Sequence, residues 1–237
     1  MRLSEDEAMF FSRVREGDIS AVEQALRIEP YLVEFRDERQ NTPLHYAVRS
    51  KSVELVRLLV STNTDVNVRD GVGDTPLHWA VEDEVDDVVA LLLEAGADVN
   101  VRNTEGKTPL HKMVETETTQ LLIDYGADIN AKDARNRTPL HYAVEWAYTN
   151  RVEFLLENGA DVDCRDDAGE TPLHWVVCAN IWSHEIHWYL ETMEILLQHG
   201  ADVNARTADG RTVLTLARER NPGRPQLADL LVRYGAK

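Results

Sequence analysis

The chain has 237 residues, 43% of them hydrophobic and 28% charged, and its 25 Lys and Arg against 42 Asp and Glu give a formal net charge of −17 at pH 7. This apolar content is typical of a packed protein and excludes a disordered acidic chain. The acidic balance, with no basic stretch to offset it, excludes nucleic acids and anionic membrane surfaces as partners.

No window reaches the roughly 18 consecutive apolar residues that a membrane helix needs, and the start of the chain is acidic where a signal peptide would be apolar. The two cysteines, Cys164 and Cys178, are too few for a disulfide framework in a chain of this length. They favour reduced thiols in a cytoplasmic protein, with the nucleus as the alternative compartment.

The first 37 residues contain two helical stretches between Ser4 and Phe35, and they lack the motif that marks the rest of the chain. This segment is therefore predicted to be an N-terminal cap. Pro30 stands where a helix-stop glycine is expected, so the geometry at the end of the cap stays open.

Two motifs then repeat in register. The tetrapeptide Thr-Pro-Leu-His begins at Thr42, Thr75, Thr108, Thr138 and Thr171, with a degraded copy, Thr-Val-Leu-Thr, at Thr212. A helix-stop motif, Gly-Ala-Asp-Val/Ile-Asn/Asp, begins at Gly96, Gly126, Gly159 and Gly200, and Asn63 opens an earlier variant. The tetrapeptides are 33, 33, 30 and 33 residues apart, which is the signature of a repeat architecture.

Each motif has a mechanical role that one copy illustrates. Thr75 is a good N-cap and Pro76 suits the first helical position, so a helix is predicted to start there. Residues 85–93 carry the apolar residues of a second, buried helix, which Gly96 ends in the left-handed conformation. The polar link that follows is rich in turn residues, as in 70–73, and is predicted to form a hairpin-like finger.

The 33-residue unit with Thr-Pro-Leu-His resembles the ankyrin repeat family. The resemblance implies an all-α solenoid of helix-turn-helix units joined by hairpin-like finger loops, and one domain spanning 1–237. The units are expected to be an N-terminal cap at 1–37, repeats at 38–70, 71–103, 104–133, 134–166 and 167–207, and a C-terminal cap at 208–237.

Two repeats depart from this length. The repeat 104–133 lacks three residues where its two helices join, which predicts a shortened helix. The repeat 167–207 is eight residues longer and is expected to extend its helices by about two turns. Trp182, Trp188 and Tyr189 in this insertion form either a local extra core or an exposed anchor for a partner.

No motif supports an enzyme. The five tetrapeptide histidines fall at the third helical position, where they can bond back to the cap or to the next repeat. His184-Glu-Ile-His187 misses the zinc-protease motif by one residue, so a metal-dependent enzyme using the 179–191 insertion is kept only as an alternative. We expect no catalytic residue, no metal and no cofactor.

The family geometry places one surface on the inner helices, near the concave face. Its candidate partner-binding residues are Tyr46, Trp79, Glu82, Asp83, Glu115, Tyr142, Glu145, Trp146 and Trp175. This surface is both aromatic and acidic, so the chain is expected to be a non-enzymatic protein–protein interaction module for a basic or amphipathic segment. A methyl-lysine peptide reader is the alternative, and we expect a monomer.

A second interpretation of these residues stays open. The aromatic side chains could instead fill space between adjacent inner helices, while the acids solvate the face. The binding interpretation predicts that Trp79→Ala weakens partner capture and leaves thermal stability largely intact, whereas a loss of folding would favour the packing interpretation.

Overall fold

The computed structural model describes residues 5–112, 116–179, 186–221 and 223–237. They form two compact units, unit 1 (Met1–Ala127) and unit 2 (Asp128–Lys237). Apart from one isolated bridge between Arg206 and Thr212, the described residues form helices and loops without β-structure, which confirms the all-α prediction. None of the helices in this part of the chain is long and apolar enough to cross a membrane.

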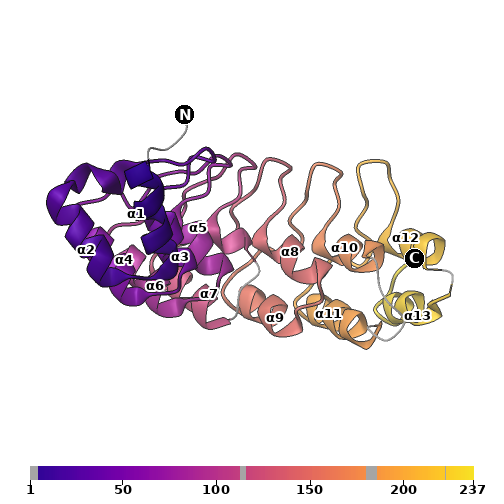
Figure 1. The fold of residues 1–237 in the computed structure, drawn as a ribbon. Coiled ribbons are helices and arrows are strands. Elements are labelled where there is room, and N and C mark those ends of the chain that lie inside the picture. The colour runs from indigo at the N-terminus through magenta and orange to yellow at the C-terminus, as the bar shows by residue number, and fades with distance from the viewer. Residues whose placement is uncertain (1–4, 113–115, 180–185, 222) are drawn as a thin grey trace. The chain divides into compact units, whose positions relative to one another are not determined.

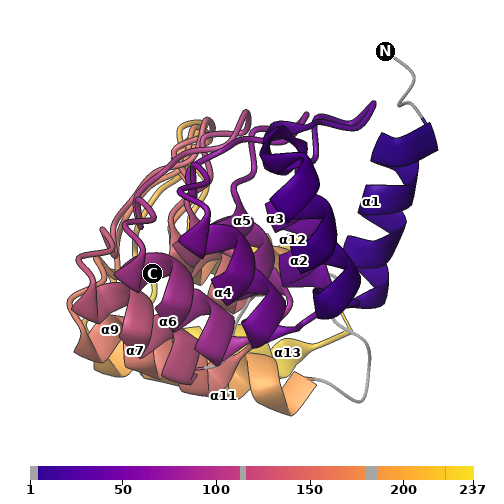
Figure 2. The same ribbon diagram turned by 60° about the vertical axis from the view of Figure 1, so that its left-hand side comes forward.

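Unit 1 begins with the helical pair of the N-terminal segment and continues with the paired helices of the repeats. Its elements are α1 (Glu5–Glu16), α2 (Ile19–Ile28), the 3-10 helix η1 (Pro30–Glu34), α3 (Pro43–Arg49), α4 (Val53–Ser61), α5 (Pro76–Glu82), α6 (Asp86–Glu94), the 3-10 helix η2 (Pro109–His111) and α7 (Thr116–Asp124). The inner helices α3 and α5 pack against each other, α4 packs against α6, and α1 covers α3 at the N-terminal end (Figure 2).

Unit 2 repeats the same arrangement three times. Its helices are α8 (Pro139–Glu145), α9 (Thr149–Glu157), α10 (Pro172–Cys178), α11 (Ile186–Gln198), α12 (Val213–Arg220) and α13 (Pro225–Arg233). Figure 1 shows α8, α10 and α12 in one row, α9, α11 and α13 in a second row, and long loops rising from the first. The core lies between the rows and between successive repeats, where Leu140, Leu155 and Leu173 are at most 1% exposed.

The tetrapeptide builds both a helix start and a joint between repeats. The backbone N–H of Thr75 donates to Nδ1 of His78 at 3.2 Å, which completes a capping box and leaves the ring proton on Nε2. Nε2 of His78 then donates to the carbonyl of Lys107 in the next repeat at 3.1 Å. The same joint links His45 to the carbonyl of Asp74 at 3.2 Å and His141 to that of Glu170 at 3.3 Å. Both roles expected for the tetrapeptide histidines are confirmed for His45, His78 and His141.

Each finger is shaped by the residue that opens it. The Asp70 N–H donates to the carbonyl of Asp74 at 2.9 Å and closes the hairpin. Oδ1 of Asp70 accepts the N–H groups of Val72 and Asp74, both at 2.9 Å, so one carboxylate oxygen holds the whole turn. The same two-bond pattern is made by Asp37, Asn103, Asp133 and Asp166.

The asparagine of the helix-stop motif makes a second joint. Oδ1 of Asn67 accepts the N–H of Asp98 at 2.7 Å, and its Nδ2 donates to the carbonyl of Gly96 at 3.2 Å. Asn130 makes the equivalent pair with the backbone of Asp161 and Gly159. This side chain therefore binds only backbone of the next repeat.

Arginines make a third joint along the base of the fingers. Nη1 of Arg36 donates to the carbonyl of Arg69 at 2.7 Å, and Arg69 donates in turn to the carbonyl of Arg102. In unit 2, Arg165 reaches the carbonyl of Arg206 at 2.6 Å. Within unit 1, Arg36, Arg69 and Arg102 are exposed and each lies one repeat from the next, so the fold brings together cations that the linear sequence does not show as a basic stretch.

The two irregular repeats differ from their neighbours as follows. In the short repeat, η2 has three residues where the other inner helices α3, α5, α8 and α10 have seven, as the missing residues predict. In the long repeat, α11 has 13 residues where α4, α6, α7, α9 and α13 have nine, a gain of about one turn. Because α10 keeps seven residues, the expected lengthening of both helices is wrong.

In the described part of the insertion, one aromatic side chain belongs to the core and another is exposed, so both alternatives drawn from the sequence occur. Tyr189 is 5% exposed and its hydroxyl donates to the carbonyl of Glu145 at 2.9 Å, so it belongs to the core. Trp188 is 45% exposed, and its ring contacts that of His187 with 4.5 Å between centroids and the planes tilted by 46°. Trp182 and His184 lie outside the described residues.

Two glycines of unit 2 both adopt a backbone conformation that favours glycine, but only one of them also lies close to a neighbouring segment. Both Gly159, after α9, and Gly169, in a finger, have positive φ, at +92° and +71°. A Cβ on Gly159 would meet nothing within 4 Å, whereas a Cβ on Gly169 would lie 2.7 Å from the backbone nitrogen of Ala208.

We expect Gly159→Ala to lower the free energy of unfolding by about 1 kcal/mol through strain alone. Gly169→Ala should lower the free energy of unfolding by a further ~0.5–1 kcal/mol, because the neighbouring finger must also move. Urea denaturation of the two variants measures the difference. Equal losses would show that adjacent fingers can separate without penalty.

Candidate functional site

The aromatic side chains predicted on the inner helices first hold their own fingers in place. Nε1 of Trp79 donates to Oδ2 of Asp70 at 3.0 Å, using the carboxylate oxygen that the finger leaves free. The same bond joins Trp175 to Asp166 at 3.0 Å, Tyr142 to Asp133 at 2.8 Å, and Tyr46 to Asp37. In each case the aspartate precedes the aromatic residue by nine, a spacing that sequence reasoning missed and that would have revealed the bond.

The aromatic residues also pack as two closely similar clusters. In unit 1, the ring centroid of Trp79 lies 5.1 Å from His45 and 6.3 Å from Tyr46, and these three form the Trp79 cluster. In unit 2, Trp175 lies 5.3 Å from His141 and 6.4 Å from Tyr142, and these three form the Trp175 cluster. Tyr142 is 9% exposed, while both tryptophans are half-buried. Each tryptophan therefore keeps part of its ring at the surface.

The Trp79 cluster is covered by cations of the chain itself. The guanidinium carbon of Arg49 lies 4.8 Å from the Trp79 ring centroid, and its Nη1 pairs with Oδ1 of Asp83 at 2.6 Å. Arg15 lies 4.1 Å from the Tyr46 ring centroid. The Trp79 ring and the Asp83 carboxylate thus bind the same arginine, and this combination is the one expected of a site for basic side chains.

The short repeat replaces the aspartate–aromatic pair with Asn103 and Lys112. Nζ of Lys112 donates to Asp74 Oδ2 at 3.1 Å and to Glu82 Oε2 at 3.2 Å, while Asn103 Nδ2 donates to Asp74 Oδ1 at 2.7 Å. Burial alone would lower the pKa of Lys112, but the two carboxylates outweigh it and raise that pKa above its ordinary value. Asp74 and Glu82 are therefore already paired with a cation of the chain.

The Trp175 cluster differs at the repeat position from which Arg49 reaches over Trp79 in unit 1. Glu145 occupies the position of Arg49, since each lies seven residues after the threonine of its repeat, and Ala179 occupies that of Asp83. Within the described residues the Glu145 carboxylate has no ion pair or hydrogen bond. Trp146, next to it, is 57% exposed. Arg137 lies 5.0 Å from the Tyr142 ring centroid, as Arg15 lies over Tyr46, but no cation of the described residues lies over Trp175. Unit 2 therefore presents a tryptophan ring and a free acid without the counterpart of Arg49.

The predicted site residues thus fall into two groups. Unit 1 holds Tyr46, Trp79, Glu82 and Asp83, each engaged by a cation of the chain. Unit 2 holds Tyr142, Glu145, Trp146 and Trp175, of which Tyr142 lies under Arg137. Glu115 lies outside the described residues. Sequence reasoning did not assign the covering role of Arg49 or the ion pairs of Lys112.

The remaining reactive side chains are buried or dispersed. Burial raises the pKa of Cys164 to about 12 and that of Cys178 to about 11, so both stay as thiols at neutral pH. Sγ of Cys164 lies 3.1 Å from Oγ1 of Thr138 inside the core. In the part of the chain that the structure describes, no three His, Cys, Asp or Glu side chains gather as metal ligands would.

Comparison with known proteins gives one consistent match. The family model described as ankyrin repeats (3 copies) matches residues 10–103, 87–166 and 152–237. The crystal structure of the ankyrin repeat domain of Bcl-3, a member of the IkappaB protein family, is similar at 30% identity and a TM-score of 0.77, covering 94% of this chain and 97% of that one. The human ASB11 ankyrin repeat domain shares 23% identity at a TM-score of 0.81, with 96% and 98% covered.

Proposed function

The chain belongs to the ankyrin repeat family, whose members are generally protein–protein interaction modules, and on this basis we propose that unit 2 binds a basic or amphipathic segment of another protein at Trp175 and Glu145. The observation that carries the proposal is the difference between the two aromatic clusters. Unit 1 contains a cation bound between Trp79 and an acid, whereas in unit 2 the equivalent Trp175 carries no cation of the described residues and Arg137 covers only its neighbour Tyr142.

The Trp79 cluster indicates how the partner's cation would be held. There, Arg49 lies over the ring and pairs with an aspartate. In unit 2 a Lys or Arg of the partner would lie over the Trp175 ring and pair with the Glu145 carboxylate. A cation over an exposed ring contributes about 0.5–1 kcal/mol, and more once water is excluded.

Trp146 extends this site with apolar surface. It is 57% exposed and follows Glu145 at the end of α8. Large aromatic side chains of this kind anchor partners at interfaces, so a segment with apolar residues beside its cation fits better than a purely basic one. The long-range field of the acidic chain would also speed the approach of such a segment.

A methyl-lysine reader is less well supported. Such a reader surrounds the methylated ammonium with several aromatic faces. Tyr142 is 9% exposed and its hydroxyl is bound to Asp133, so Trp175 offers the more open face of this cluster. We therefore propose an unmodified lysine or arginine as the cation.

Replacing the acid by the cation that unit 1 uses should close the site. We expect Glu145→Arg to place a guanidinium over Trp175, as Arg49 lies over Trp79, and to abolish binding of synthetic basic peptides selected from an array on the wild-type chain. Glu153→Arg on the exposed side of α9 makes the same charge change and serves as the control.

Titration of each variant with the selected peptides, followed by fluorescence anisotropy, measures the effect. Binding should fall at least tenfold in Glu145→Arg and much less in the control. Equal losses in the two variants would indicate a general charge effect and would contradict a site at Trp175.

A further inference from the structure

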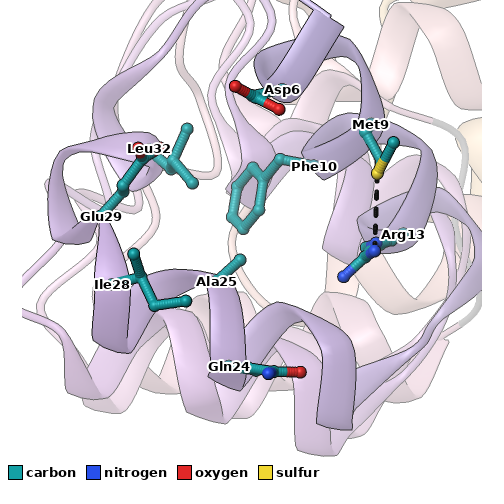
Figure 3. A pocket seen from close by; sticks show the side chains of 9 residues that line it. All are labelled: Asp6, Met9, Phe10, Arg13, Gln24, Ala25, Ile28, Glu29 and Leu32. Atoms are coloured by element: carbon teal, nitrogen blue, oxygen red, sulfur yellow. Dashed lines mark hydrogen bonds between the residues drawn. The ribbon is translucent and has the colours of Figure 1, made fainter.

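A groove lies on the outer side of the N-terminal helices of unit 1, between α1 on one side and α2 with η1 on the other (Figure 3). Its volume is about 370 Å³. Phe10 and Leu32 form its floor and are 2% and 3% exposed. Met9 and Ile28 stand at its rims and are 53% and 73% exposed, which leaves two large apolar side chains in water.

This face is not the polar outer surface that a terminal cap requires. The opposite side of α1 is occupied, because Phe11 and Val14 are buried there and the Phe11 ring contacts Tyr46 with 5.6 Å between centroids. Tyr31, close to the groove in sequence, is a further large side chain that is 54% exposed. Such a concentration of exposed apolar side chains marks an interaction surface.

The groove-facing side of α1 carries charges of opposite sign at its two ends. Asp6 and Arg13 both line the groove and are seven residues apart, so they lie about 10 Å apart along one helix face. The Arg13 guanidinium donates to Sδ of Met9 at 3.5 Å, and the ion pairs of the described residues include neither Asp6 nor Arg13. Met9 lies between the two charges.

We propose that this groove is a homodimer interface, in which α1 packs antiparallel to α1 of a second copy of the chain. The antiparallel arrangement places Asp6 opposite the partner's Arg13 and Arg13 opposite the partner's Asp6, with Met9 and Ile28 of both copies covered between them. A twofold axis requires such a self-complementary pattern, in which opposite charges lie at equal distances from an apolar centre. The inference does not depend on the proposed function, because the face belongs to unit 1 and the basic-segment site to unit 2. It replaces the expectation of a monomer.

Sedimentation equilibrium over a wide range of concentrations tests the apolar part of the interface. The wild-type chain should show a monomer–dimer equilibrium, and Ile28→Asp should weaken it at least tenfold. Val232→Asp on α13, where the valine is 49% exposed, is the matched control and should leave the equilibrium unchanged. Circular dichroism confirms that each variant is folded.

A charge exchange tests the orientation of the two copies. Asp6→Arg alone and Arg13→Asp alone should each weaken the dimer, because each places like charges opposite one another. The double variant Asp6→Arg with Arg13→Asp should restore it, since both pairs are reversed together. A wild-type chain that stays monomeric at millimolar concentration overturns the proposal and leaves the face to a different partner. A dimer that Ile28→Asp does not weaken, or that the double variant does not recover, overturns it as well.

Discussion

Lowering the pH from 7 to 5 should reduce the free energy of unfolding by at least about 2 kcal/mol, because the tetrapeptide histidines are buried in their neutral form. Burial, and secondly the nearby Arg165 guanidinium, lower the pKa of His174 to about 4. Burial also lowers the pKa of His45, His78 and His141. A proton on Nδ1 of His174 would in addition remove the acceptor for the backbone N–H of Thr171.

The sign follows from comparing the two states. An unfolded histidine has a pKa near 6.5 and takes up a proton below that pH, while folded His174 stays neutral down to about pH 4. Its stabilising contribution is therefore complete above pH 6.5 and is lost as the pH falls from 6.5 to about 4. Asp133 behaves differently. Burial alone would raise its pKa, but its hydrogen bonds to Arg137 and Tyr142 lower that pKa to about 2. The stability that Asp133 contributes is therefore lost only below about pH 4.

A single substitution separates His174 from the rest. Glutamine at this helical position can accept the threonine N–H as histidine does, yet it does not titrate. Between pH 7 and pH 5 we expect the free energy of unfolding of His174→Gln to fall by about 2 kcal/mol less than that of the wild-type chain. Urea denaturation at each pH measures it. His199→Gln, at the exposed end of α11, is the control. An unchanged pH dependence in His174→Gln would contradict the assignment.

Trp79→Ala should lower the free energy of unfolding by about 3 kcal/mol. The substitution removes the ring contacts with His45 and Tyr46, the support beneath Arg49, and the hydrogen bond that ties the finger to the inner helix through Asp70. This outcome differs from the expectation drawn from sequence, in which Trp79 is a surface anchor whose loss leaves stability intact. The contacts of Trp79 favour the packing interpretation for this residue.

Two further variants divide that loss into its parts. Trp79→Phe keeps an aromatic ring and removes the indole N–H, so it should cost about 1 kcal/mol. Trp146→Ala removes a tryptophan that is 57% exposed and should cost less than about 0.5 kcal/mol. Thermal and urea denaturation of the three variants measure this order. A Trp79→Ala chain as stable as Trp146→Ala would restore the surface-anchor interpretation.

The local structure was predictable because its causes are local. Thr75, Pro76 and Gly96 fix where helices start and stop through their own backbone preferences, and the structure places a helix start after Thr75 and a positive φ at Gly96. Asn63 adopts the left-handed conformation in place of glycine, with φ of 62°. The three missing residues of the short repeat likewise predicted a shortened helix.

The character of the binding surface was less predictable because it depends on pairs from different repeats. Glu82, Asp83 and Glu145 look alike in sequence, but only the last is free of a cation within the described residues. That difference arises because Arg49 and Lys112, 34 and 30 residues from their acids, reach across to neighbouring repeats. A list of acidic positions carries no information about such partners.

The joints between repeats have a consequence for how this chain could diversify. His78, Asn67 and Arg36 each bind a backbone carbonyl or N–H of the next repeat, and almost every residue type supplies those groups. A repeat can therefore be duplicated or exchanged without matching side chains at the seam. Selection is left free to alter the outward positions, and two descendants of one repeat pair can come to hold an arginine in one place and a glutamate in the other.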